Sequence, residues 1–199
     1  MQNNTRLKIA RQIDAVLALH KVGKDANTLD VGCGEGAITN YLASKYKKVV
    51  GVDVDIPALE FAKKHYKKKN LQFLYMSAEK LTFPAQSFDI VVCNQVYMYL
   101  TNPKKLFQEI HRVLKSGGIC FLGAVNTYSW TAFTHPEYSY KSWWELQRLC
   151  HDFQITSYAA FIVKRKYKVF RWVPNGIVSF LAPFLPNFVW ILERAGNQE

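Results

Sequence analysis

The sequence lacks the cysteine patterns of disulfide scaffolds and of zinc sites. Its four cysteines lie far apart and form no C-x-x-C pair: Cys33, Cys93, Cys120 and Cys150. This spacing argues against a disulfide framework and predicts no metal site. It favours a reducing cytoplasm as the place where the protein works.

The sequence predicts no signal peptide and shows neither an internal repeat nor a low-complexity segment. Residues 1–20 scatter Arg and Lys among apolar residues, so the uninterrupted apolar core of a signal peptide is missing. The chain has 199 residues, of which 49% are hydrophobic and 21% are charged. These values are those of an ordinary globular protein, and they predict one domain rather than two.

Acidic residues are few. The chain has 15 Asp and Glu against 26 Lys and Arg, which gives a formal net charge of +11. Such a charge can serve binding to RNA, to an anionic membrane surface or to an acidic substrate. Because the lysines are spread along the chain, we favour a solvated basic surface.

The strongest local bias lies near the C-terminus. Residues 164–171, KRKYKVFR, carry five basic side chains, and residues 172–192 carry no charge. The uncharged run has the length of a membrane span, but three prolines would break the helix: Pro174, Pro183 and Pro186. Three uses stay open for residues 164–192: a solvent-facing edge strand, contact with lipid at the inner membrane surface, or RNA binding.

Short apolar runs alternate with helical patterns along the chain. The pattern predicts strands at 28–31, 48–53, 71–76, 88–93 and 119–125, and helices at 6–21, 37–46, 57–66 and 103–115. We expect Asn102 to cap the last of these helices and Gly117-Gly118 to end it. Further on, the pattern predicts a helix at 143–151 and strands at 155–163 and 188–192. Such alternation predicts a parallel sheet with helices on both faces.

Residues 29–42, LDVGCGEGAITNYL, place three glycines directly after a predicted strand. Ligands of open parallel sheets bind beyond the carboxyl ends of the strands. Gly32, Gly34 and Gly36 let the chain turn sharply and let a ligand approach the backbone. Asp53 ends the next predicted strand, where its carboxylate can accept both hydroxyls of a ribose.

Two cofactors fit this loop. Gly32, Gly34 and Ala37 satisfy the dinucleotide motif G-x-G-x-x-G/A. An adenosyl cofactor with a compact cationic end also explains Asp30 and Glu35, because acids repel a pyrophosphate but attract a sulfonium or an ammonium. A plainer alternative is that both acids only cap the turn and the following helix.

Five sequence blocks occur in a familiar order. They are DVGCGEG (30–36), VVGVD (49–53), SAEKLTFP (77–84), SFDIVVCN (87–94) and LFQEIHRVLKSGG (106–118). In this order they resemble the class I S-adenosylmethionine-dependent methyltransferases, most of all the small-molecule branch that includes the ubiquinone and menaquinone methyltransferases.

The resemblance implies a fold and a division of the chain. The fold is α/β and Rossmann-like, with a doubly wound, mostly parallel seven-stranded sheet and an antiparallel C-terminal strand. The division, within one methyltransferase domain, is an N-terminal helix (1–25), a cofactor-binding core (26–125) and substrate-side loops with the C-terminal strands (126–199).

The resemblance also implies S-adenosylmethionine as cofactor and S-adenosylhomocysteine as product. Asp30 and the glycine backbone would face the methionine portion, and Asp53 would hold the ribose. The residues assigned in this way to the cofactor are Asp30, Gly32, Cys33, Gly34, Gly36, Asp53, Val54, Ser77, Ala78, Glu79, Asn94, Gln95 and Val96. Ser77 departs from the family's usual Asp, so we expect a weaker bond to the adenine amino group.

The implied reaction is in-line transfer of a methyl group to a small, fairly apolar acceptor. An oxygen or carbon acceptor often needs a base, and His135, after the fifth strand, is the candidate. A structural or solvated role is the alternative for this histidine. Candidate walls of the acceptor pocket, unless they only pack a lid, are Tyr97, Tyr99, Tyr128 and Trp130.

Some acceptors are disfavoured. Residues 94–97 read NQVY instead of the Asn/Asp-Pro-Pro-aromatic sequence of amino-methyltransferases, and the chain has no Pro-Cys dipeptide of the RNA 5-methylcytosine enzymes. The alternatives that stay open are an RNA or protein methyltransferase using residues 164–171, a catalytically silent cofactor-binding partner and, least favoured, a dehydrogenase.

Overall fold

A single sheet runs through the molecule. The computed structural model describes residues 2–127, 129–158, 160–161, 168–169 and 187–195. Seven strands have the order β3-β2-β1-β4-β5-β9-β6. Their bounds are β1 (Asn27–Val31), β2 (Lys48–Asp53), β3 (Leu71–Tyr75), β4 (Phe88–Asn94), β5 (Leu114–Val125), β6 (Gln154–Tyr158) and β9 (Asn187–Glu193).

Strand directions follow the prediction. Strands β1 to β5 pair in parallel, whereas β9 is antiparallel to both β5 and β6. The predicted doubly wound, mostly parallel seven-stranded sheet with an antiparallel C-terminal strand is therefore confirmed. The strand order reverses at β1, which lies between β2 and β4. In such sheets the crevice at the carboxyl ends of these strands is where ligands bind.

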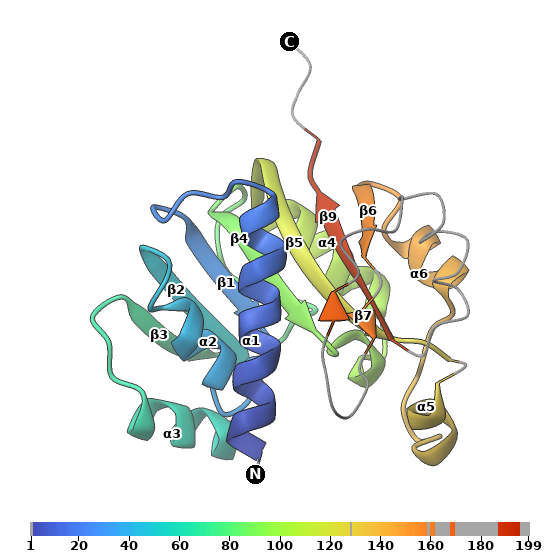
Figure 1. Ribbon diagram of the computed structural model, residues 1–199, viewed down its shortest axis with the longest axis horizontal. Helices are drawn as coiled ribbons and strands as arrows, with labels where there is room; N and C mark the ends of the chain where they lie inside the picture. Colours follow the sequence, from blue (N-terminus) through green and yellow to red (C-terminus); the bar gives the residue numbers. More distant parts are fainter. Residues whose placement is uncertain (1, 128, 159, 162–167, 170–186, 196–199) are drawn as a thin grey trace.

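Helices cover both faces of the sheet. Figure 1 shows α1 and α2 in front of the strands and α4 behind them. The helices are α1 (Gln2–Leu19), α2 (Ala37–Leu42), α3 (Ile56–His65), α4 (Pro103–Val113), α5 (Trp130–Thr134) and α6 (Trp143–Leu149), with a 3-10 turn η1 at Tyr97–Tyr99. The sequence pattern missed α5 and η1, because each has a single turn and shows no periodicity.

The two faces of β4 show how the sheet is buried. Ile90 and Val92 point to one face, in a cluster with α1 residues such as Ile13. Val91 and Cys93 point to the other face, in a cluster with α4 and α6 residues. Because both faces are apolar, the strand reads as a continuous hydrophobic run rather than an alternating one.

The junction of α4 and β5 differs from the prediction. Helix α4 ends at Val113, and β5 begins at the next residue, so Gly117-Gly118 lie within the strand segment instead of ending the helix. The side chain of Asn102 makes no capping hydrogen bond. At the other end of the helix, the guanidinium of Arg194 donates to the carbonyls of His111, Arg112 and Leu114. Local helix signals cannot predict this cap, because Arg194 lies 80 positions from Leu114 in the sequence.

The C-terminal part is only partly described. The predicted strand at 155–163 is β6, followed by β7 (Ala160–Phe161), which pairs with β8 (Lys168–Val169) in a separate two-stranded sheet. The predicted strand at 188–192 is confirmed as β9. Most of the basic segment and of the uncharged run lie outside the described residues. Within the described ranges, no helix is long and apolar enough to cross a membrane.

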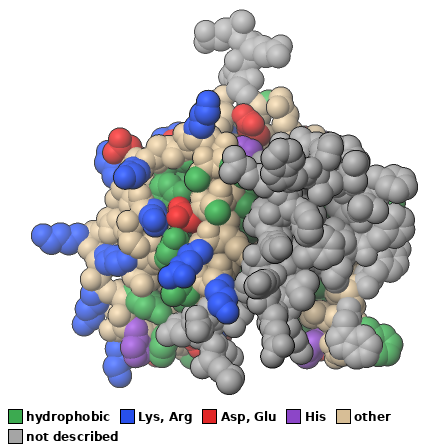
Figure 2. Space-filling model, in the orientation of Figure 1, with side chains coloured by type: hydrophobic (Ala, Val, Ile, Leu, Met, Phe, Trp, Pro, Cys, Tyr) green, Lys and Arg blue, Asp and Glu red, His purple; other side chains and the backbone are tan. Residues whose placement is uncertain are grey.

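Basic side chains are dispersed on the face that carries α1 and α2. Figure 2 shows Lys and Arg scattered over this face beside the grey atoms, without a single dense patch. This distribution agrees, for the visible part of this face, with a solvated basic surface.

Candidate functional site

The glycine-rich loop after β1 is held tightly against its neighbours. The backbone N–H of Gly32 donates to Val52 O at 2.8 Å, and Gly32 has a φ of 71°. A Cβ at this position would lie 2.4 Å from a methyl group of Val96. At Gly36, with φ 78°, a Cβ would lie 2.6 Å from the ring of Phe73. Both positions therefore require glycine for conformation and for space.

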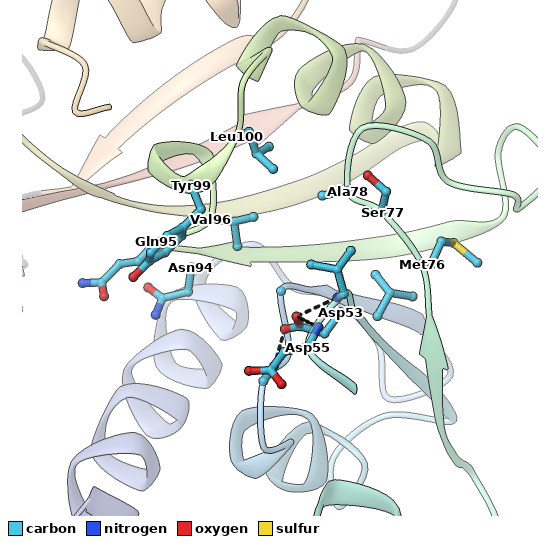
Figure 3. Close-up of a pocket in the computed structure, with 14 residues that line it drawn as sticks. Asp53, Asp55, Met76, Ser77, Ala78, Asn94, Gln95, Val96, Tyr99 and Leu100 are labelled. Carbon is cyan, nitrogen blue, oxygen red and sulfur yellow. Dashed lines mark hydrogen bonds between the residues drawn. The ribbon is translucent and has the colours of Figure 1, made fainter. Parts of the chain in front are cut away.

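Asp53 is fixed at the carboxyl end of β2 by three backbone amides. Gly34 N–H donates to its Oδ2 at 2.7 Å, and Val54 and Asp55 N–H donate to its Oδ1 at 2.7 and 3.0 Å (Figure 3). Such bonds stabilise an ionised carboxylate and fix its orientation. A carboxylate has about four acceptor positions, so Asp53 retains capacity for a ligand hydroxyl.

A hollow of about 450 Å³, the main hollow, opens beside Asp53 (Figure 3). It is lined by Gly32, Gly34, Val52, Asp53, Val54, Asp55, Met76, Ser77, Ala78, Asn94, Gln95, Val96, Tyr99 and Leu100. The structure thus brings together, at the ends of β1, β2, β3 and β4, nine of the residues that the resemblance assigned to the cofactor. The side chains of two others, Cys33 and Asp30, belong to the next hollow.

A second hollow of about 260 Å³, the side hollow, joins the main one. Its walls are Arg6, Ile9, Asp30, Gly32, Cys33, Gly34, Ala37, Ile38, Asn94, Gln95 and Tyr99. Five of these residues also line the main hollow, so the two form one cleft. Gly36 and Glu79 line neither hollow. The amide of Glu79 is bound to Ser77 Oγ, and its carboxylate accepts from Asn102 N–H.

The side hollow contains charges of both signs. Asp30 is buried and accepts a 2.6 Å hydrogen bond from Thr39 Oγ1. Burial raises the pKa of Asp30 to about 7, although the Thr39 bond opposes this rise. Arg6 reaches the hollow from α1 and forms an ion pair with Glu35 at 2.5 Å. A ligand group with both an ammonium and a carboxylate would find partners here.

A third hollow of about 520 Å³, the outer hollow, lies beyond η1. It is lined by Thr127, Ser129, Ala132, Phe133, Pro136, Tyr138, Ser139 and Tyr140. None of these residues is charged. Tyr99, from the walls of the other two hollows, packs edge-on against Tyr138 with ring centroids 4.7 Å apart. The outer hollow is thus a neighbour of the cleft, and the two rings pack between them.

The predicted acceptor residues have different positions. Tyr99 lies in the cleft, but Tyr97 is fully buried and its hydroxyl donates to the carbonyl of Val125, so it packs the core. Tyr128 and the side chain of Trp130 lie outside the described residues. His135 lines none of these three hollows. Its exposed ring is 3.0 Å from Glu137, and its centroid is 6.1 Å from that of Tyr138.

Sequence reasoning missed several wall residues. Tyr138 and Tyr140 stand in an aromatic-rich loop, which was a usable signal. Arg6 offered no such signal in the sequence, because a basic residue in an N-terminal helix is ordinarily expected to face solvent. Its position depends on the packing of α1 against α2 and the sheet.

The glycine-rich loop, the fixed acid at the end of β2 and the position at the strand-order reversal define a nucleotide-cofactor-binding α/β domain. A family model described as a methyltransferase domain matches residues 29–122. This match and a curated relative support a methyltransferase domain of the class I, S-adenosylmethionine-dependent type, which the sequence predicted.

A curated relative agrees with this family, and solved structures share the fold. A ubiquinone biosynthesis O-methyltransferase from Coxiella burnetii is 30% identical over 164 residues, which cover 79% of this chain but only 65% of that protein. A chain from the complex between the Haloferax volcanii Trm112 methyltransferase activator and a methyltransferase has a TM-score of 0.72 at 17% identity, covering 94% of this chain and 90% of its own. The [4+2]-cyclase SpnF has a TM-score of 0.73 at 18% identity, covering 94% and 81%.

Proposed function

We propose that this protein transfers a methyl group from S-adenosylmethionine to a small, uncharged and fairly apolar acceptor. One observation carries the proposal: a cleft with a fixed acid and a side hollow of mixed charge lies next to an uncharged hollow, since Tyr99 of the cleft contacts Tyr138 of the outer hollow. The cleft suits the methyl donor, and the outer hollow suits the acceptor.

The described residues fit an adenosyl cofactor with an amino-acid end. We assign the ribose hydroxyls to Asp53, whose carboxylate faces the main hollow. We assign the α-ammonium group to Asp30 and the α-carboxylate to Arg6, the two side chains of opposite charge around the side hollow. A pyrophosphate would meet Asp30 in the same place and be repelled, which disfavours a dinucleotide.

The chemistry needs alignment more than a reactive side chain. When bound, S-adenosylmethionine supplies an activated methyl group. The protein then has to hold the acceptor in line and exclude water. Tyr99 is unsuited as a base at neutral pH, because burial raises its pKa from an already high value. His135 stays our candidate base, since Glu137 can orient its ring and Tyr138, a wall of the outer hollow, is next to it.

The relatives favour an oxygen atom on a small molecule as acceptor. The Coxiella relative is named as an O-methyltransferase of ubiquinone biosynthesis. The cyclase with the same fold is named for another reaction, so the fold by itself does not establish methyl transfer. A structural neighbour was solved in complex with the methyltransferase activator Trm112, so the assay should also be run with a candidate activator protein.

The proposal is tested by incubating the protein with methyl-labelled S-adenosylmethionine and a cell extract, then separating organic, small aqueous, RNA and protein fractions. We expect label in the organic or small-molecule fraction. Asp53→Asn is the control, since it removes one of the two oxygens that accept backbone N–H groups, weakens both ribose binding and the loop, and should lose the label. Label in RNA or protein would replace the proposal by the alternative enzyme class. No label despite cofactor binding would make the protein a binding module.

We further propose that residues 164–192 contact lipid or an anionic membrane surface. The composition of this segment supports the proposal, and RNA is the competing partner. Truncation before this segment is a poor test, because it removes β9 from between β5 and β6. Replacing the five basic residues of 164–171 by Gln retains β9. Loss of binding to anionic vesicles, with unchanged RNA binding, is the expected result.

A further inference from the structure

Gln95 has a strained backbone at the end of β4. Among the described residues, three that are not glycine have a positive φ: Lys21, Gln86 and Gln95. Gln95 has φ 60°, a conformation that disfavours any residue with a Cβ. The strain is held in place because its N–H donates to Gly123 O at 2.8 Å. Strain of this kind persists where the surroundings impose it, and it concentrates at functional sites.

The strained residue occupies the meeting point of the two cofactor hollows. Gln95 lines both the main hollow and the side hollow. Its side chain extends away from Asp53, as does that of Asn94 (Figure 3). The backbone conformation therefore directs the carboxamide of Gln95 away from the ribose-binding acid.

Three neutral polar groups gather at this meeting point. They are the carboxamides of Asn94 and Gln95 and the phenol of Tyr99, which all line both hollows. None of the three side-chain groups forms a hydrogen bond with any residue that the structure describes. A primary amide can donate and accept, so it can bind a hydroxyl or a carbonyl. A cationic amine would find no opposite charge among these three groups.

We infer that Gln95 is an acceptor-binding residue, held in a strained conformation so that its carboxamide binds an uncharged oxygen group of the acceptor next to the methyl group to be transferred. The inference rests on the proposed function and adds the residue that orients the acceptor. It also assigns a chemical class, a hydroxyl or carbonyl compound, to the group that approaches the donor.

The chain offers a matched control. Gln86 is the same residue type with nearly the same φ, 56°, but it lies in the turn before β4, at the opposite end of that strand. Its N–H donates to Arg112 O, far from the cleft. Glycine relieves the same strain at both positions, so Q86G separates the effect on stability from the effect on the acceptor.

The experiment compares Q95G, Q95N and Q86G with the unmodified protein. Each is assayed for melting temperature, for S-adenosylmethionine affinity by calorimetry, and for label transfer to the organic extract of a cell lysate. Both glycine variants should melt about 2 °C higher, because strain is removed. Q95G should retain cofactor affinity within about twofold and lose label transfer by about tenfold or more. Q95N, which tolerates a positive φ and retains an amide, should recover part of that transfer.

Two results would overturn the inference. Label transfer by Q95G equal to that by Q86G would show that the carboxamide does not touch the acceptor. A fall in cofactor affinity that matches the fall in transfer would make Gln95 a cofactor residue. If the unmodified protein binds cofactor yet labels no fraction, the proposed function itself fails. That failure is distinct from the two results above, because both of them require label transfer by the unmodified protein.

Discussion

The proposed cofactor side and the proposed acceptor side of this molecule are built differently. The cofactor side uses backbone: glycines that turn at strand ends, and amides that fix Asp53. The acceptor side uses loops after β4 and β5, whose tyrosines meet through ring contacts. A site made of strand ends tolerates little change, whereas a site made of loops can change its ligand without affecting the sheet. Variants on the two sides should therefore separate cofactor affinity from turnover.

The largest effect is expected in the glycine loop. Gly32→Ala places a Cβ 2.4 Å from Val96 in a left-handed turn, so S-adenosylmethionine affinity should fall by at least about 100-fold. Gly117→Ala is the matched control, since Gly117 has φ 72°, no atom lies within 4 Å of its Cβ and it lines neither the main hollow nor the side hollow. Calorimetric titration of both variants checks the prediction, and equal losses would show that backbone strain alone matters.

On the acceptor side, His135→Ala should lower turnover by about 100-fold if His135 is the base. Cofactor affinity should not change, because His135 lines neither cofactor hollow. The check is a paired measurement of kcat and cofactor Kd. Unchanged turnover would show that the exposed His135–Glu137 pair only stabilises its loop.

The pH dependence of cofactor binding tests the side hollow. Asp30 has a pKa raised to about 7 by burial, so it is protonated below that pH in the cofactor-free protein. Binding of an ammonium favours the ionised form, and affinity should rise about tenfold between about pH 6 and 8. The stability of the cofactor-free protein should change in the opposite direction. Its melting temperature should fall as pH rises from about 4 toward 7, because the folded protein then loses the proton that its buried Asp30 holds. Asp30→Asn should flatten both profiles; an unaltered affinity profile would remove Asp30 from the cofactor site.

A smaller effect is expected at Arg6. Arg6→Ala should weaken S-adenosylmethionine binding about fivefold, since the partly exposed guanidinium contributes only a screened charge. Arg11→Ala, also on α1 but outside the walls of the cleft, should leave the affinity unchanged. Equal effects of the two variants would indicate a general charge effect rather than a bond to the carboxylate.

The smallest effect is expected at Ser77, which lines the main hollow. Ser77→Asp should raise cofactor affinity about threefold by restoring a charged acceptor for the adenine amino group. Binding isotherms check this prediction, and no gain would count against the placing of adenine near Ser77.

The sequence predicted the parts that obey local rules. Both ends of β2 were predicted correctly, because a run of β-branched residues that ends in Asp indicates a buried strand with a polar residue at its end. The end of α4 was not predicted correctly, because carbonyls of its last turn accept hydrogen bonds from Arg194, which follows β9. The same limit applies to the site. Asp53 and the glycines are local signals, whereas Arg6, Tyr138 and the conformation of Gln95 depend on how distant segments pack.

The most direct test of methyl transfer is to quantify S-adenosylhomocysteine while the protein is incubated with labelled S-adenosylmethionine and the organic extract. The account predicts that S-adenosylhomocysteine and labelled acceptor form in equal amounts, and that Asp53→Asn forms neither. Tight binding of S-adenosylmethionine without any S-adenosylhomocysteine would contradict the account and leave a cofactor-binding protein without this activity.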